Sequence, residues 1–320
     1  MKIGITGAAG FIGMHLTDSL LSNGHEVVGI DSLKPAYGGD LSIHRANNLR
    51  EIHDFEVDVL DISETKVIEL VKLFEDCDVV VHLAAWPGVR QGQLMPNLYA
   101  KNNVTAFSNI LEAVREIKPK HFMYASSSSI YGDLAKNGPV RETDASGLNL
   151  KSYYAATKWM NETEARASQE LVGFPITALR FFTVYGPWGR PDMAYWSFLE
   201  KVKSNQEISL YGETGGSRNF TYIKDSVKIL VDLIGADLTT KHRSLNIACG
   251  DPDETIQMLK AIAIAAKGEP KIRIVERPKV DVEKTWADLQ NISELITLPQ
   301  QTPLASGLTE FVSWYESYVK

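Results

Sequence analysis

The sequence is short of cysteine, long apolar runs and positive charge. Its 320 residues include two cysteines, Cys77 and Cys249, without paired spacing, so we expect a reducing, cytoplasmic location and no metal site. No apolar run approaches the roughly 18 residues of a membrane span, and the N-terminus lacks a secretory pattern, so we expect no membrane partner. The net charge of −7 argues against a nucleic-acid partner, which would require a basic patch.

The first half of the chain alternates short apolar strands with amphipathic helices, which predicts a doubly wound, Rossmann-type α/β fold with a parallel sheet. We expect strands at 2–6, 26–30, 55–57, 79–85, 121–125 and 176–180, helices from the glycine turn to Leu21 and over 64–74, 97–117 and 152–172, and an irregular loop at 32–50. After Arg180 this alternation is lost. We therefore assign 1–180 to a first, Rossmann-type domain, to which later segments return, and 181–320 mainly to a smaller, discontinuous α/β lobe.

A glycine-rich turn, 7–13, follows the first strand and opens the first helix. In this context the glycines allow a tight turn, and backbone amides at the helix N-terminus can approach a pyrophosphate. The second strand ends at Asp31, whose carboxylate would accept hydrogen bonds from ribose hydroxyls and repel a 2′-phosphate. The alternative is a plain turn, but the strand, turn, helix and acid together favour NAD over NADP.

A second candidate site combines Tyr154, Lys158 and the four serines at 126–129. Tyr154 and Lys158 are one helical turn apart on the same face, and a nearby ammonium lowers the pKa of a phenol. Such a pair can take a proton from a sugar hydroxyl while a hydride leaves the same carbon. The alternative for Tyr154 and Lys158 is a solvated helix face without a catalytic role, and the alternative for the four serines is a polar loop. The serines, however, follow a central strand at its carboxyl end, where ligands bind in doubly wound sheets.

With these residues assembled, the chain resembles the extended short-chain dehydrogenase/reductase family, in its nucleotide-sugar epimerase branch, and most of all UDP-glucuronate 4-epimerases. The resemblance rests on the motifs at 6–13, Asp58, 82–85, 88–90, 126–132, Tyr154-x-x-x-Lys158, 180–193 and 217–222. It implies a seven-stranded parallel sheet, bound NAD, and a homodimer formed through helices 97–117 and 152–172.

The resemblance also implies roles for individual residues. Ser127, Tyr154 and Lys158 would be catalytic. NAD would contact Gly7, Gly10, Phe11, Ile12, Gly13, Asp31, Asp58, Val59, Leu83, Ala84, Ala85, Asn103, Tyr154 and Lys158. The UDP-sugar would contact Arg90, Ser128, Ser129, Thr183, Arg190, Arg218 and Asp281.

The implied reaction is interconversion of UDP-glucuronate and UDP-galacturonate, both polysaccharide precursors, through a 4-keto sugar. Ser128 and Ser129 stand where related dehydratases carry Asp-Glu, and Ser129 stands where related decarboxylases carry Glu, so simple epimerisation is favoured. Two departures from the family pattern bear on the substrate: Trp86-Pro87 replaces Gln-Ala, and the glycine before Asp281 is missing. The alternatives are a 4-epimerase of UDP-glucose or UDP-N-acetylglucosamine, and an NAD-binding sensor without catalysis.

Overall fold

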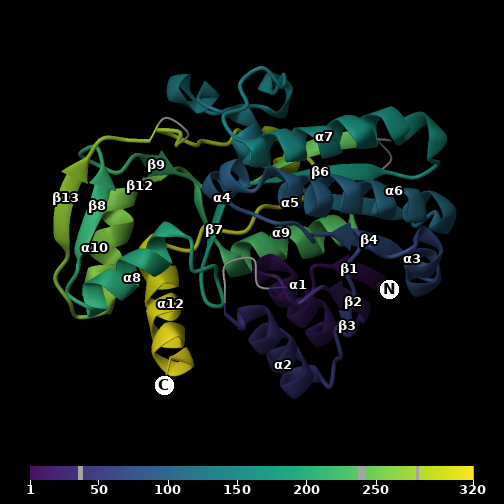
Figure 1. Cartoon of the computed structure of the whole chain (residues 1–320), viewed down its shortest axis with the longest axis horizontal. Helices are drawn as coiled ribbons and strands as arrows, with labels where there is room; N and C mark the ends of the chain where they lie inside the picture. The colour runs from purple at the N-terminus through teal and green to yellow at the C-terminus, as the bar shows by residue number, and fades with distance from the viewer. Residues whose placement is uncertain (35–38, 237–241, 279–280, 320) are drawn as a thin grey trace.

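The computed structural model describes residues 1–34, 39–236, 242–278 and 281–319, and its centre is a seven-stranded parallel sheet (Figure 1). The strand order is β3-β2-β1-β4-β5-β6-β11. The strands are β1 (Lys2–Thr6), β2 (Glu26–Asp31), β3 (Asp58–Val59), β4 (Val79–His82), β5 (His121–Ser127), β6 (Ile176–Phe181) and β11 (His242–Ile247). The predicted fold class is therefore confirmed. From β1 the chain adds strands in one direction across the sheet, and from β4 it adds them in the opposite direction. Ligands bind in such sheets at the carboxyl ends of the strands beside this switch point.

Helices cover both faces of the sheet (Figure 1). One layer contains α3 (Val67–Phe74), α6 (Ala106–Ile117) and α7 (Tyr153–Ser168), and the other contains α1 (Phe11–Ser22) and α9 (Ile223–Gly235). In β4, Val80 packs with the first layer, whereas Val79 and Val81 pack with the second. A strand buried on both faces requires a continuous apolar run, which explains the sequence of this strand.

A smaller group of elements lies at the left of Figure 1. The strand pairs are β8 (Glu207–Tyr211) with β13 (Lys271–Val275), β7 (Thr183–Tyr185) with β10 (Phe220–Tyr222), and β9 (Ser217–Arg218) with β12 (Asp253–Glu254). The helices there are α8 (Ala194–Lys203), α10 (Thr255–Ala265) and α12 (Leu304–Tyr318). The division at residue 180 stays a prediction, and α9 and β11 are later segments that pack with the large sheet.

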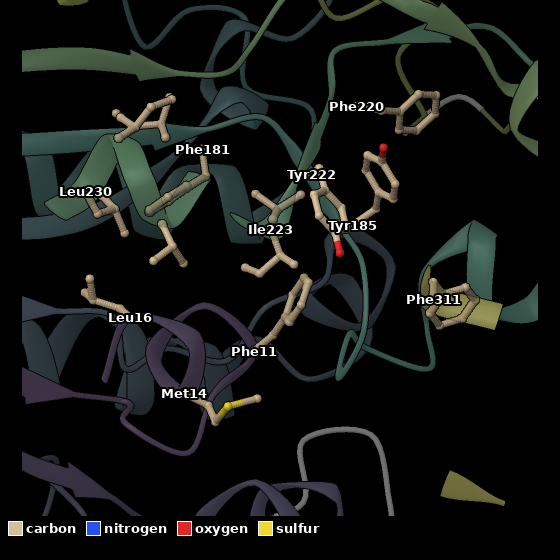
Figure 2. Close-up of a cluster of buried hydrophobic side chains, with 14 of the residues drawn as sticks. Phe11, Met14, Leu16, Phe181, Tyr185, Phe220, Tyr222, Ile223, Leu230 and Phe311 are labelled. Atoms are coloured by element: carbon tan, nitrogen blue, oxygen red, sulfur yellow. The ribbon is translucent and has the colours of Figure 1, made fainter. Parts of the chain in front are cut away.

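An aromatic and aliphatic cluster joins the two groups (Figure 2). Phe11 and Met14 of α1 are buried in it, together with Tyr222 of β10, Ile223 of α9 and Phe311 of α12. Figure 2 shows the Phe11 ring directed toward Ile223. The first helix after the glycine turn is thereby anchored to the smaller group of elements.

Two local predictions near the second strand were wrong. The irregular loop expected at 32–50 contains a helix, α2 (Leu41–His53), while residues 35–38 lie outside the described part. Its buried residues are Leu41, Arg45 and Leu49, at a helical spacing of four. The strand expected at 55–57 is displaced to β3, because Asp58 and Val59 are the residues that pair with Ile30 and Asp31.

Other element boundaries also differ from the predictions. The helix expected at 97–117 is divided into α5 (Pro96–Tyr99), a π-helical segment η1 (Ala100–Thr105) and α6. β4 ends at His82, so 83–85 are loop rather than strand, and α7 is followed by a 3₁₀ turn, η5 (Gln169–Leu171). The remaining short elements are α4 (Val89–Leu94), η2 (Ser128–Tyr131), η3 (Leu134–Asn137), η4 (Glu142–Asp144) and α11 (Gln290–Ser293).

Within the described ranges, no helix combines the length and apolar character needed to cross a bilayer. The same ranges contain no group of three or more His, Cys, Asp or Glu side chains placed to hold a metal ion.

Candidate active site

The glycine turn packs tightly against the end of β4. Gly7 has a φ of +75°, and a Cβ there would lie 2.7 Å from the amide nitrogen of Ala84. A Cβ on Gly13 would lie 1.9 Å from the carbonyl oxygen of Gly7, so neither position accepts a side chain. Gly10 begins α1, and no described side chain caps that helix. The turn therefore leaves the first amides of α1, including those of Phe11 and Ile12, for an anionic ligand.

Asp31 lies at the end of β2, beside the glycine turn. One carboxylate oxygen accepts from the amide of Ala9 at 3.1 Å, and the other accepts from the amide of Leu33 at 2.9 Å. Burial raises the pKa of Asp31, while these two hydrogen bonds act in the opposite direction. The exposed Asp58 and Val59 lie in the adjacent strand, and Val59 is in register with Asp31. The structure thus brings the three predicted adenosine-side residues together.

The segment after β4 is fixed from two sides. The amide of Ala84 donates to Thr6 Oγ1 at 3.2 Å. The side chain of Asn103 accepts from the amide of Trp86 at 2.7 Å and donates to its carbonyl oxygen at 3.0 Å. Asn103 therefore anchors the 84–86 segment, and its direct contact with NAD stays a prediction.

Ser127, Tyr154 and Lys158 converge at the carboxyl end of β5. Ser152 caps α7 by accepting from the amide of Ala155 at 3.0 Å, which places Tyr154 in the first turn of the helix. The hydroxyl of Ser127 lies beside the Tyr154 phenol and acts to lower its pKa. Lys158 is buried, and its Nζ donates to the carbonyl oxygen of Ala125 at 2.9 Å. The three predicted catalytic residues therefore share one site.

The predicted direction of the Tyr154 pKa was wrong. Burial raises the pKa of Tyr154, and the cation of Arg190 and the hydroxyl of Ser127 only partly oppose this. Burial also lowers the pKa of Lys158 to about 7. The physical reason is shared, because moving either group out of water disfavours its charged form. The nearby cation that acts on the phenol is Arg190.

Hydroxyl groups line the same edge of the sheet. Ser127 is in register with Phe181, so Ser128, Ser129 and Thr183 follow neighbouring strands at one end. Ser127 Oγ accepts from the amide of Ser129 at 3.1 Å. The Oγ of Ser129 is buried and has no hydrogen-bond partner among the described residues. A buried hydroxyl without a partner is unfavourable unless a ligand satisfies it.

A buried ion pair supports these serines. Glu162, one turn beyond Lys158 on α7, accepts from Ser126 Oγ at 2.5 Å and from Arg180 Nε and Nη2 at 2.9 and 2.7 Å. Both charged side chains are only 1% exposed. Burial raises the pKa of Glu162, but the bonds from Arg180 outweigh it, so the net direction is downward. The pair fixes the end of β5 to α7 and β6.

The predicted substrate arginines occupy different surroundings. Arg218 donates to the carbonyl oxygens of Ser217, Glu283 and Val282 at 2.9, 2.8 and 2.5 Å, and its pKa is lowered to about 10, first by burial. Arg190 forms an ion pair with Asp192 at 3.6 Å, near Tyr154. Arg190 therefore lies near Tyr154, whereas Arg218 lies in β9 among carbonyl oxygens.

Arg90 and Asp281 are brought together as an ion pair. Arg90 Nη2 donates to Asp281 Oδ2 at 2.6 Å, and its guanidinium lies 5.3 Å from the ring centroid of Tyr211. The missing-glycine position, Val280, lies outside the described residues. Because Arg90 occupies the Asp281 carboxylate, the contact of Asp281 with a ribose stays a prediction.

Two arginines of the site region were missed by the sequence analysis. Arg277 donates to the carbonyl oxygen of Tyr211 at 2.9 Å, and its positive charge contributes to lowering the pKa of Arg218. Arg45 contacts the glycine turn and the loop before Arg190. The spacing of Leu41, Arg45 and Leu49 could have revealed the helix that carries Arg45; no signal in the sequence pointed to Arg277.

Comparison with known proteins agrees with this geometry. Residues 3–248 match the NAD dependent epimerase/dehydratase family. A probable UDP-glucuronate 4-epimerase of Rhizobium meliloti is 34% identical over 334 residues, covering 99% of this chain and 97% of the relative. An uncharacterized UDP-glucose epimerase of Bacillus subtilis is 34% identical over 322 residues, covering 99% of this chain and 98% of the relative.

A solved structure of UDP-glucuronic acid 4-epimerase from Bacillus cereus, in complex with UDP-glucuronic acid and NAD, has a TM-score of 0.90 and 31% identity. The match covers 99% of this chain and 100% of that one. The predicted family is confirmed: the chain belongs to the NAD dependent epimerase/dehydratase family.

Proposed function

We propose that the protein is an NAD-dependent UDP-sugar 4-epimerase that interconverts UDP-glucuronate and UDP-galacturonate. The observation that carries this proposal is the placement of Ser127 beside Tyr154, at an edge of the sheet where Ser128, Ser129 and Thr183 supply further hydroxyls. The names of the Rhizobium and Bacillus cereus proteins support the same substrate.

The residues present fit NAD. The glycine turn leaves helix amides for a diphosphate, and Asp31 offers an oriented carboxylate for ribose hydroxyls. When bound, NAD accepts a hydride from the sugar and returns it.

We expect Asp31 to set the choice of cofactor. The wild type should prefer NAD over NADP, and Asp31→Ser should reduce that preference by about tenfold or more, because it loses hydrogen bonds and the repulsion of a 2′-phosphate. The affinity of the protein for each dinucleotide measures this. Asp54→Ser, at the end of α2, is the control. An unchanged preference in Asp31→Ser would place the ribose elsewhere.

Residues of this chain remove and return the proton of the sugar 4-hydroxyl. Ser127 orients the sugar 4-hydroxyl, and Tyr154 as phenolate takes its proton while the hydride leaves C4. The resulting 4-keto sugar turns over about its link to the diphosphate. Hydride then returns to the opposite face, and Tyr154 gives the proton back, so configuration inverts and no redox equivalent is consumed. Arg190 favours the phenolate by its charge. Arg218 and Arg277 provide cations for the diphosphate.

UDP-glucuronate raises a specific chemical difficulty. Oxidation at C4 makes a β-keto acid, which loses CO₂ when the carboxyl bond aligns with the carbonyl π system. An epimerase must hold the carboxylate out of that alignment. The unpartnered hydroxyl of Ser129, with Ser128 and Thr183 at the same edge, supports this role, because hydroxyls orient a carboxylate through charge-assisted hydrogen bonds.

We therefore expect Thr183→Val to raise the KM for UDP-glucuronate about tenfold, or to release a UDP-pentose, since a hydrogen bond to a charged group is lost. Kinetics and product analysis by NMR measure both. Thr163→Val, on the exposed side of α7, is the control. Kinetics of Thr183→Val that match the wild type would remove Thr183 from the carboxylate site.

The substrate itself is tested with a panel of UDP-sugars and epimer ratios measured by NMR. Faster turnover of UDP-glucose or UDP-N-acetylglucosamine than of UDP-glucuronate would favour the neutral-sugar alternative. Bound NAD without turnover of any UDP-sugar would indicate a sensor.

We also propose the homodimer through 97–117 and 152–172, which carry exposed residues such as Glu112 and Met160. Light scattering of the purified protein tests it. Cytoplasmic location stays a prediction, supported by Cys77 and Cys249, which are both free and buried.

A further inference from the structure

Arg45 joins two segments that are far apart in the sequence. Its Nη1 donates to the carbonyl oxygen of Ala9, in the glycine turn, at 3.4 Å. Its Nε and Nη2 donate to the carbonyl oxygen of Trp188 at 3.0 and 2.6 Å, and Nη2 also donates to that of Gly189 at 3.0 Å. One side chain thus holds the glycine turn against the loop that leads to Arg190.

The charge of Arg45 is not needed to neutralise a neighbouring acid. Arg45 is only 6% exposed, and no carboxylate of the described residues pairs with it. Burial lowers its pKa to about 10, so it remains charged at neutral pH, and Asp31 acts on it only as a more distant charge. Burying an unpaired cation is unfavourable. A guanidinium nevertheless supplies what this place requires, a planar fork of donors that reaches several carbonyl oxygens at once.

The loop that Arg45 holds is strained and is fixed from other sides as well. Trp188 has a φ of +60°, which a bulky side chain rarely adopts. His15 of α1 is hydrogen-bonded to the carbonyl oxygen of Pro187 at 3.0 Å. The Trp188 ring packs against Trp314 of α12, with centroids 5.1 Å apart. The loop conformation therefore depends on contacts from the cofactor side, which include those of Arg45.

We propose that Arg45 is a positioning residue that couples the cofactor turn to the substrate loop. By fixing Trp188 and Gly189 against Ala9, it sets the place of Arg190 beside Tyr154. A UDP diphosphate that contacts Arg190, as a further cation beside Arg218 and Arg277, then stabilises the glycine turn through this loop, and the reverse also holds, because such coupling is reciprocal. The inference rests on the proposed function only in requiring NAD and a UDP group, not a particular sugar.

The test is the release of NAD from the purified holoenzyme, measured with and without saturating UDP. We expect UDP to slow release about tenfold in the wild type and less than about twofold in Arg45→Met. Arg50→Met is the matched control, because Arg50 lies on the same helix and is exposed, and the one side-chain bond of its guanidinium within the described ranges is to Asn47 of that helix. It should keep the full effect of UDP.

A wild-type effect of UDP that persists in Arg45→Met overturns the proposal, as does a wild type on which UDP has no effect. If Arg45→Met does not fold, Arg45→Lys is measured instead. It keeps the charge but loses the planar fork of donors, so UDP should slow NAD release less than it does in the wild type. A full UDP effect in Arg45→Lys, when Arg45→Met does not fold, would assign Arg45 to stability alone. Failure to turn over UDP-glucuronate would refute the proposed substrate and leave this result untouched.

Discussion

Replacing Tyr154 with phenylalanine should lower kcat by about 10² to 10⁴, because the ring remains and the proton-accepting oxygen is lost. NAD should remain bound, since the glycine turn and Asp31 are unaffected. Stopped assays of epimer ratio, together with the NAD content of the purified variant, measure the two effects separately.

The pH dependence of this variant provides a second readout. Burial raises the pKa of Tyr154, so kcat of the wild type should rise with pH as the phenol loses its proton. Tyr154→Phe should lack that rise. Tyr153→Phe is the control, because Tyr153 is the preceding residue of α7 and so lies off the helix face that carries Tyr154 and Lys158. Turnover of Tyr154→Phe within a few-fold of the wild type would assign the proton to another group.

The second large effect concerns stability. Glu162→Gln should lower the free energy of unfolding by about 3 to 5 kcal/mol, because it leaves the buried guanidinium of Arg180 without its counter-ion. Urea denaturation of the variant and the wild type measures this. Glu112→Gln, on the exposed side of α6, should stay within about 0.5 kcal/mol of the wild type.

A double variant distinguishes the lost pair from lost packing. Glu162→Leu combined with Arg180→Met removes both charges, and it should be more stable than Glu162→Gln alone, since no charge remains buried and unpaired. A double variant less stable than Glu162→Gln would mean that the bonds of Arg180 to Tyr131 and Glu142 outweigh its pairing with Glu162.

The parallel α/β fold class and the main site could be predicted because both leave local patterns in the sequence. Val79 to Val81 form a strand buried on two faces, and this requires only apolar residues in succession. Tyr154 and Lys158 lie on one helical face by spacing alone. The fold class followed from such patterns, whereas the number of strands and the role of Ser127 beside Tyr154 followed from the resemblance to the family.

The remaining features depend on contacts between distant segments. The pKa of Tyr154 is set by burial, which no spacing of residues reveals. Asp281 could be predicted as polar and near the substrate, but not as the partner of Arg90, which lies 191 positions away. Arg277 was missed for the same reason, because its bonds reach back to Tyr211.

The position of β11 has a consequence for how the chain is made. β6 ends at Phe181, yet its outer neighbour in the sheet is not complete until Ile247, 66 residues later. At about 5 to 20 residues per second on the ribosome, the outer edge of β6 stays open for roughly 3 to 13 seconds. An open, apolar strand edge is a template for pairing with other chains. A fragment ending near residue 180 should therefore aggregate, and the nascent chain is most vulnerable in that interval.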